Sequence, residues 1–381
     1  MSTYKSPWVN EELEIFRKSV RQFFEEEFQP HQEKWRAQHH VDRDAWEKAG
    51  AMGILLTDVP EEYGGGGGNF AYEAVVIEEL AKAGINFGTQ IQSIVAHYVL
   101  TYGSEDQKRR WLPALAKGEM VAALAMTEPA AGSDVQSIRT TAIRKGDEYL
   151  INGSKTFITN GYHADLVCLA AKTDPSLTGS KGTSLIMIET RDLPGYRVGR
   201  TLEKLGQHDQ DTCELFFDDV RVPASNLVGS EEGKGFAQMM QQLPYERTLV
   251  AIAAVAAMER AIEITVKHAK DRKMFGKTLF DLQNTRFKLA ECRTEAQIGR
   301  VFLDHCIERV IDGTLDTATA SMAKYWLTDK QCQIADECLQ LHGGYGYTTE
   351  YEIAHIWADA RVQRIYAGAN EVMKELVARS L

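Results

Sequence analysis

The chain has 381 residues and a formal net charge of −11, from 43 basic and 54 acidic side chains. That length suggests two or three domains, and 44% apolar with 25% charged residues is the balance of an ordinary globular protein. The acidity disfavours nucleic acid and anionic membrane surfaces as partners, because both attract basic proteins. We therefore expect no nucleic-acid partner.

The longest apolar run, Leu249 to Met258, is far shorter than a membrane-spanning helix of about 20 residues, so we expect no membrane insertion. The six cysteines include no C-x-x-C pair, which predicts no metal site. The N-terminus lacks the apolar core of a secretory signal and the arginines of a transit peptide. This predicts a bacterial cytoplasmic protein, or one of the mitochondrial matrix if a leader has been removed.

Residues 1–121 are expected to form an N-terminal α-helical domain. Apolar side chains recur at helical spacing between Leu13 and Phe28, and Pro30 ends the run. Ser104-Glu-Asp-Gln107 has capping-box spacing and predicts the start of another helix. Five glycines at 64–68 predict a flexible surface loop. No Gly-Lys-Ser/Thr follows them, so they do not form a phosphate-binding P-loop.

Residues 122–232 change to short β-rich runs without intervening helices. Such runs lie at 149–151, 156–159, 165–169, 183–188 and 212–217. Turn signals separate them at Lys145-Gly, Asn152-Gly and Asn160-Gly. The pattern favours an antiparallel β-sheet or barrel over a parallel sheet with crossover helices.

Residues 233–381 are expected to form a C-terminal helical bundle. Apolar residues recur mostly at alternating three- and four-residue steps from Leu282 to Val310, and again from Leu327 to Leu341. Such a seam is typical of a helix packed in a four-helix bundle. The predicted fold is therefore α+β and multidomain: an N-terminal helical domain, a middle antiparallel β-barrel and a C-terminal four-helix bundle.

A stretch at the junction of the first two domains offers groups for ligand binding. It reads Ala125-Met-Thr-Glu-Pro-Ala-Ala-Gly-Ser-Asp134 and supplies a threonine hydroxyl and backbone donors around a turn of small residues. Such a turn can bind a phosphate or the edge of a flat heteroaromatic ligand. Taken alone, these residues also fit an ordinary connection between two domains, and that interpretation is the commoner one.

This stretch closely resembles the signature of the acyl-CoA dehydrogenase family, and four further motifs follow in the family's order. They are Phe157-Ile-Thr-Asn-Gly161, Asp271-Arg-Lys-Met-Phe-Gly-Lys277 followed by Gln283, Leu339-Gln-Leu-His-Gly-Gly-Tyr-Gly346, and Ile365-Tyr-Ala-Gly-Ala-Asn-Glu371. The resemblance covers essentially the whole chain, and it is strongest to the long-chain and isovaleryl branch. Five motifs in order are specific, whereas one alone is weak.

The resemblance implies a homotetrameric flavoenzyme with FAD between the middle sheet and the C-terminal bundle. The residues implied near the flavin are Met126, Thr127, Phe157, Ile158 and Thr159. A neighbouring subunit is expected to hold the FAD pyrophosphate and adenosine through Arg272, Phe275, Gln283, Gln340, Leu341, Gly343 and Gly344. Arginine suits a pyrophosphate because its guanidinium is planar and permanently charged. Asn370 and Glu371 of the tail motif complete the expected cofactor contacts.

The implied reaction removes two hydrogens from Cα and Cβ of an acyl-CoA thioester and gives a trans-2-enoyl-CoA. Ser133 matches the position that contacts the pantetheine, and Tyr245, Arg247 and Gly368 are expected to contact the substrate. The thioester carbonyl is expected to bind the FAD ribityl hydroxyl and a backbone amide of the tail loop, which acidifies the α-proton. Electron-transferring flavoprotein is the implied acceptor.

The tail motif of this chain does not supply the catalytic base. Many relatives carry a glutamate in the tail motif, where this chain has Ala367. The long-chain and isovaleryl branches carry the base in a glutamate–arginine element of a bundle helix, and Pro244-Tyr-Glu-Arg-Thr-Leu249 lies at the matching place. We therefore expect Glu246 to take the α-proton while the β-hydrogen leaves as a hydride to flavin N5. A carboxylate in a dry pocket suits this task because burial raises its basicity.

The small Ala367 leaves room near the reacting carbons, which suits medium- or long-chain or branched acyl groups. Two other functions also fit the sequence. A flavin oxidase of the same fold differs only in passing electrons to oxygen. The loss of the tail carboxylate also fits a catalytically silent protein that binds acyl-CoA or flavin as an assembly factor.

Overall fold

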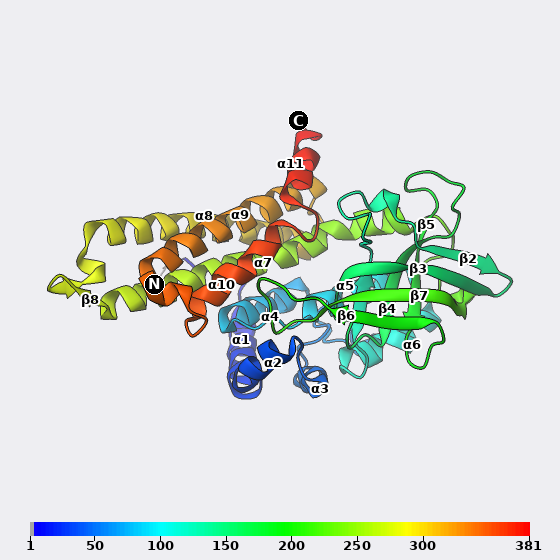
Figure 1. The fold of residues 1–381 in the computed structure, drawn as a ribbon, viewed down its shortest axis with the longest axis horizontal. Coiled ribbons are helices and arrows are strands. Elements are labelled where there is room, and N and C mark those ends of the chain that lie inside the picture. Colours follow the sequence, from blue (N-terminus) through cyan, green and yellow to red (C-terminus); the bar gives the residue numbers. More distant parts are fainter. Residues whose placement is uncertain (1–3) are drawn as a thin grey trace.

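The computed structural model describes residues 4–381, and its first part is helical (Figure 1). Its helices are α1 Glu11–Phe23, α2 Gln32–Gln38, α3 Arg43–Met52, α4 Phe70–Ala83, α5 Thr89–Tyr102 and α6 Glu105–Ala116. The predicted capping box is confirmed at the start of α6, because the side chains of Ser104 and Gln107 each accept a hydrogen bond from the other residue's backbone amide. Along residues 4–381, no helix combines the length and apolar character needed to cross a membrane.

The glycine run is a loop, as predicted, and its backbone is held by hydrogen bonds. The amides of Gly65, Gly66, Gly67 and Gly68 all donate to backbone carbonyls between residues 56 and 60. A Cβ on Gly65 would lie 2.2 Å from the carbonyl oxygen of Val59, so the chain passes too close for a side chain. The glycines therefore serve a close approach of two backbones rather than mobility.

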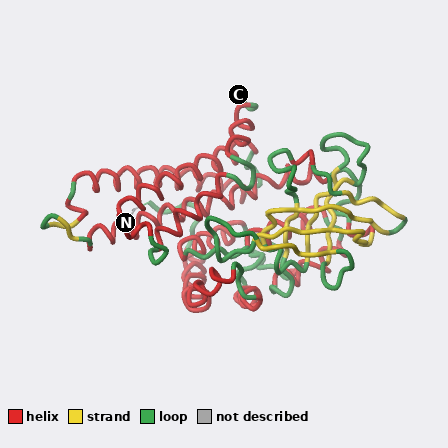
Figure 2. Tube along the Cα trace, viewed as in Figure 1, coloured by secondary structure: helices red, strands yellow, loops and turns green. Residues whose placement is uncertain are grey.

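The middle part is a curled β-sheet, which confirms the predicted β domain (Figure 2). Its strands are β1 Ala122–Ala125, β2 Thr141–Lys145, β3 Glu148–Thr159, β4 Leu166–Lys172, β5 Thr183–Glu189, β6 Tyr196–Thr201 and β7 Thr212–Pro223. They follow the order β1-β4-β2-β3-β7-β6, with β5 paired to β4. Most pairs are antiparallel as predicted, but β1 and β2 pair with β4 in parallel. These pairs join strands that are not connected by a hairpin, so no local turn signal marks them.

The prediction of a turn at Asn152-Gly was wrong. β3 runs through these residues, and its register against β7 shifts between Ile151 and Gly153. Gly153 has φ +148, and a Cβ there would lie 2.4 Å from Oγ1 of Thr140. The dipeptide therefore marks a bulge and a close approach within one long strand, which is a common use of glycine in strands.

The last part is a helical bundle joined at its tip by a short hairpin. Its elements are α7 Gly235–Asp271, β8 Lys273–Met274, β9 Lys277–Thr278, α8 Gln283–Ile311, α9 Thr317–His342, α10 Glu352–Ala360 and α11 Asn370–Ala378. The predicted seam is buried, from Leu289 and Cys292 to Leu303 and Cys306. Helix α7 starts beside the sheet and ends at the hairpin, so it links the two ends of the molecule (Figure 1).

Candidate active site

Glu246 lies where the three domains meet. It is 5% exposed, in the N-terminal third of α7, and Oε1 accepts a hydrogen bond of 2.8 Å from the Tyr98 hydroxyl of α5. Burial raises the pKa of Glu246 to about 7, against the opposing effects of the Tyr98 hydrogen bond and Arg247. Its charge also helps burial raise the pKa of the Cys168 thiol in β4. A buried carboxyl that titrates near neutrality is suited to proton abstraction.

The sequence of α7 explains why this carboxylate is dry. Residues 246–256 are all buried, because the apolar run that starts at Leu249 draws the preceding turn into the core. Glutamate and arginine are rarely buried unless paired or functional. Glu246 and Arg247 are therefore exceptions that the fold keeps in place.

Arg247 lies against the tail loop. Its Nη1 donates to Ser321 Oγ at 3.1 Å, and burial lowers the pKa of the guanidinium to about 10. Its buried Nε has no hydrogen-bond partner among the described residues. Its Nη2 lies 3.9 Å from the place that a Cβ on Gly368 would occupy. The backbone of Ala367 and Gly368, both with positive φ, thus lies beside the arginine.

Asn370 and Glu371 follow this loop at the start of α11. The side chain of Asn370 is 1% exposed, and its Nδ2 donates to Asp329 Oδ1 at 2.9 Å and Thr328 Oγ1 at 3.0 Å. Its Oδ1 accepts from Lys324 Nζ at 2.9 Å. Asn370 is thus engaged within the protein and fixes the loop, whereas Glu371 is exposed.

The sheet side of the junction is held by a buried ion pair. Lys155 Nζ lies 2.8 Å from Glu128 Oε1 and donates to the carbonyl of Met126 at 2.8 Å. Burial lowers the pKa of Lys155 to about 8, although Glu128 acts against the shift. The Thr156 amide donates to the carbonyl of Thr127 at 3.0 Å. These bonds fix the main chain at Met126 and Thr127.

Phe157 is exposed at the end of β3, and its neighbour Ile158 is not. Phe157 has φ +59 and is 66% exposed, at a second register shift against β7. Ile158 is 1% exposed in the β-domain core, so only its backbone can meet a ligand. Thr159 is half-buried, and Asn160 Nδ2 donates to the carbonyls of Gly88 and Ala122.

Tyr245 and Ser133 differ in their surroundings. Tyr245 faces the N-terminal helices: its hydroxyl donates to Asp58 Oδ2 at 3.2 Å, and its ring packs on Phe70 and His97. Ser133 is exposed beyond the Glu128–Ala131 turn.

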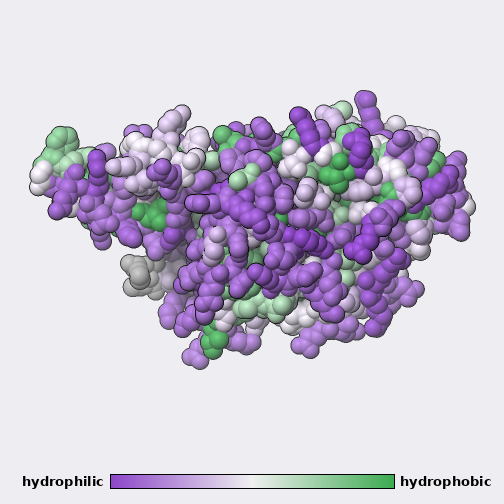
Figure 3. Space-filling model, turned by 60° about the horizontal axis from the view of Figure 1, so that its bottom comes forward, coloured by the Kyte–Doolittle hydropathy of each residue, from purple (hydrophilic) through white to green (hydrophobic). Residues whose placement is uncertain are grey.

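The other expected cofactor residues lie at the far end of the bundle. The exposed members of this group are Arg272, Phe275, Gln283, Gln340, Gly343 and Gly344, with Leu341 half-buried. The Arg272 guanidinium lies 5.6 Å from the centre of the Tyr345 ring, and Phe275 is 87% exposed. Figure 3 shows hydrophobic colour at the tip where Figure 1 places β8. At 1.5 Å per residue, α7 separates Arg272 from Glu246 by about 39 Å. The structure thus divides the candidates into a near group around Glu246 and a far group around Arg272.

Sequence reasoning missed three residues of the near group: Tyr98, Lys155 and Lys324. Tyr98 lies in an apolar helix and gives no separate signal. Lys155 shares a strand face with the buried Ile151, and Lys324 falls between the buried Ala320 and Leu327 of α9. For Lys155 and Lys324, the sequence signal that could have identified them is a lysine on the inward face of its strand or helix, where lysine is rare.

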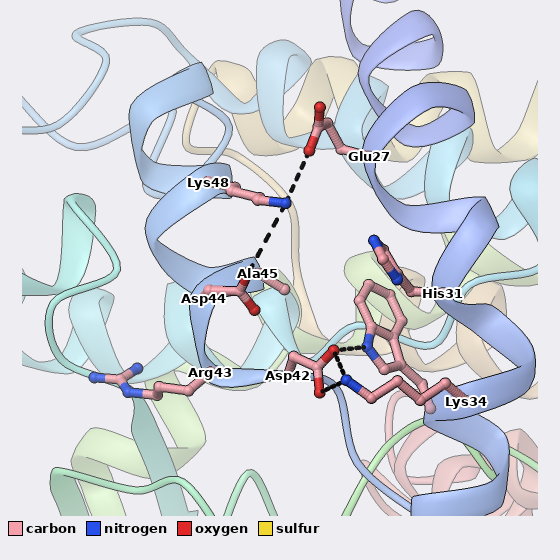
Figure 4. A pocket seen from close by; sticks show the side chains of 9 residues that line it. Glu27, His31, Lys34, Asp42, Arg43, Asp44, Ala45 and Lys48 are labelled. Atoms are coloured by element: carbon pink, nitrogen blue, oxygen red, sulfur yellow. Dashed lines mark hydrogen bonds and ion pairs between the residues drawn. The ribbon is translucent and has the colours of Figure 1, made fainter.

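Two polar cavities lie away from Glu246. The first, of about 490 Å³, is bordered by Glu27, Lys34, Asp42 and Lys48, whose charges pair with one another (Figure 4). The second, of about 850 Å³, includes Arg36, His208, Arg260 and Asp359. Neither includes an expected site residue. Within residues 4–381 no cluster of three His, Cys, Asp or Glu could hold a metal.

The structure combines a helical domain, a curled β-sheet and a helical bundle, which meet at a buried glutamate. This combination defines the class of protein. Sequence models of the acyl-CoA dehydrogenase N-terminal, middle and C-terminal domains match residues 10–119, 123–220 and 233–381. The chain therefore belongs to the acyl-CoA dehydrogenase family of FAD-dependent oxidoreductases, and it is an enzyme of that family.

Individual relatives place it near the long-chain members. It is 46% identical over 373 residues to long-chain specific acyl-CoA dehydrogenase, mitochondrial, of Mus musculus, covering 97% of this chain and 86% of that protein. The acyl-CoA dehydrogenase structure from Geobacillus kaustophilus is 47% identical with TM-score 0.96 and covers 99% of both chains. A glutaryl-CoA dehydrogenase from Mycobacterium smegmatis, solved with FADH2, is 28% identical with TM-score 0.91, covering 98% of this chain and 95% of that one.

Proposed function

We propose that the protein is an FAD-dependent dehydrogenase that converts medium- or long-chain or branched acyl-CoA to trans-2-enoyl-CoA, with Glu246 as the base. The observation that carries this proposal is the state of Glu246. It is buried at the junction of the three domains, its pKa is raised to about 7, and Tyr98 orients it. The tail loop offers no carboxylate at Ala367, so no second base competes there.

The residues at the junction fit a flavin. Phe157 presents an exposed ring, and Thr127 and Thr159 present partly exposed hydroxyls on main chain that is fixed by hydrogen bonds. Phe157 and Thr159 sit on the sheet, and Met126 borders the same junction. When bound, FAD supplies the two-electron acceptor for the hydrogen that leaves Cβ.

The chain's own residues then divide the remaining work. Glu246 removes the α-proton, and its low exposure limits competing water. Arg247 places a buried positive charge beside the tail loop, where negative charge develops on the thioester oxygen. Gly368 lets the loop backbone approach the substrate, and we assign the exposed Ser133 to the pantetheine.

The far group supports a homotetramer. Arg272 offers a permanent charge for a pyrophosphate and Phe275 an exposed ring, yet both lie too far along α7 to serve the same chain's junction. We assign them, with Gln283, Gln340 and the glycines, to the FAD of a neighbouring subunit. Electron-transferring flavoprotein is the proposed acceptor and the bacterial cytoplasm the proposed location.

The test is anaerobic mixing of the purified holoprotein with acyl-CoA substrates while the oxidised flavin absorbance is followed. Straight chains of four to sixteen carbons are compared with methyl-branched ones. The proposal expects flavin reduction, with the highest kcat/KM for long or branched chains. A sharp optimum at four carbons contradicts the chain-length assignment. No reduction by any acyl-CoA favours the silent protein, and fast reoxidation by oxygen favours the oxidase.

A further inference from the structure

Two lysines are almost completely buried among the described residues, Lys155 at 1% exposure and Lys324 at 0%. A buried ammonium is costly unless it is paired or hydrogen-bonded. Each donates to a main-chain carbonyl of the proposed site: Lys155 to Met126 at 2.8 Å and Lys324 to Gly368 at 2.7 Å. One lysine thus holds the sheet side of the site and the other holds the tail loop.

The two lysines differ in their surroundings. Lys155 pairs with the carboxylate of Glu128. The second acceptor of Lys324 is the amide oxygen of Asn370, at 2.9 Å. Burial first and repulsion from Arg247 second lower the pKa of Lys324 to about 7. An apolar residue at this position of α9 would avoid the cost of burying a charge. We therefore attribute the presence of the lysine to its hydrogen bonds with Gly368 and Asn370.

The loop that Lys324 contacts has an unusual backbone. Ala367 and Gly368 have φ values of +51 and +91, and a residue with a Cβ resists the first of these. The Gly368 carbonyl is fixed by Lys324, and Asn370, which also binds Lys324, anchors the start of α11. Lys324 therefore joins both ends of the short segment from Gly368 to Asn370.

We infer that Lys324 is a positioning residue of the proposed reaction: its ammonium fixes the Ala367–Gly368 backbone so that the loop presents an amide to the thioester carbonyl. The inference rests on the proposed function. Lys324 need not touch the substrate. It acts by holding a hydrogen-bond donor in place before the substrate arrives. Such a preorganised donor is effective because it need not reorient during the reaction.

The test separates carbonyl recognition from general stability. Lys324→Met keeps the length of the side chain and removes the donor. Two ligands are titrated calorimetrically into the FAD-loaded protein. One is an acyl-CoA analogue with sulfur in place of the β-carbon, which keeps the thioester carbonyl and is not dehydrogenated. The other is the matching alkyl-CoA thioether, which has no carbonyl.

We expect K324M to bind the thioester analogue about 10- to 100-fold more weakly, as for a lost charge-supported hydrogen bond. The carbonyl-free thioether should change by less than about twofold, because its contacts do not use the loop amide. The control is Leu327→Ala, in the next turn of α9 and fully buried in the bundle core. It should lower the melting temperature but leave both affinities nearly unchanged.

Equal changes for the two ligands, or no change for either, overturn the inference. If K324M does not fold, Lys324→Gln has a shorter side chain that falls short of the Gly368 carbonyl, and the same two outcomes decide. Failure of the wild-type protein to bind the thioester analogue would instead contradict the proposed function itself.

Discussion

The two ends of α7 present opposite environments. Near its start, Glu246 and Arg247 are buried, and they hydrogen-bond to Tyr98 of the N-terminal domain and Ser321 of the C-terminal domain. At its end, Arg272 and Phe275 stand exposed on a hairpin, with a ring of the same chain as the partner of the arginine. In the proposed function, one chain therefore completes the proton-transfer half of the site, and the exposed residues at the hairpin serve the nucleotide half of another chain's site.

The largest expected effect is at the buried end. Glu246→Gln should lower kcat by about 10³-fold, within the range for loss of a general base. The fold and FAD content should be unchanged, because glutamine keeps the shape and still accepts the Tyr98 hydrogen bond. Steady-state turnover and the flavin-to-protein ratio measure both. A loss of less than about tenfold contradicts Glu246 as the base.

The second largest effect is expected at the buried ion pair between Lys155 and Glu128. Lys155→Met leaves Glu128 without its cation and should destabilise the protein by about 3 kcal/mol, as for a broken buried pair. Denaturant unfolding measures the loss. The double variant with Glu128→Gln removes both charges and should recover part of the stability. Additive losses in the double variant would show that the pair is not coupled.

The exposed end is tested by complementation between chains. Arg272→Ala should weaken FAD binding by about tenfold, as for a lost contact with a charged group, whereas Arg309→Ala, an exposed arginine at the other end of α8, should not. Arg272→Ala and Glu246→Gln chains are each expected to be impaired alone. Co-expressed, they should regain activity, because the intact Glu246 of one chain meets the intact Arg272 of the other. Mixed oligomers without regained activity would place Arg272 outside the partner's site.

The smallest expected effect refines the buried end. Tyr98→Phe removes a hydrogen bond that lowers the pKa of Glu246, so that pKa should rise. The rise in this pKa should be about one unit or less. Flavin reduction should therefore slow several-fold below neutral pH and be unchanged at high pH. Tyr102→Phe is the matched control, because its hydroxyl donates to Gln241. Equal pH profiles for both variants would show that the Tyr98 hydrogen bond does not set the pKa of Glu246.

The fold was largely predictable because apolar period is a local property of the chain. The change from helical to strand period marked the three domains, and the seam from Leu282 to Val310 marked the bundle. Glu246 was proposed as the base from the family resemblance of its glutamate–arginine element, together with the absence of a carboxylate at Ala367. Tyr98 was not, because it meets Glu246 from 148 residues away in the sequence, a contact that only the fold creates. The bulge at Gly153 was missed because Asn-Gly has the same sequence signature in a turn.

The buried lysines show a further limit of sequence reasoning. Their inward positions are visible in the sequence, but their acceptors are carbonyls, which every residue carries. No side-chain pattern identifies Met126 or Gly368 as the partner. Such contacts with the main chain become evident only in the structure.

The pH dependence of anaerobic flavin reduction tests most directly whether the buried Glu246, oriented by Tyr98, takes the α-proton. The base acts deprotonated, so the rate should rise with pH, reach half of its plateau near the pKa of about 7 that burial gives this group, and level off above it. The same profile in Glu246→Gln should be slow and without this inflection. A wild-type rate that does not change between about pH 5 and 9, or an inflection that persists unchanged in Glu246→Gln, would contradict the account.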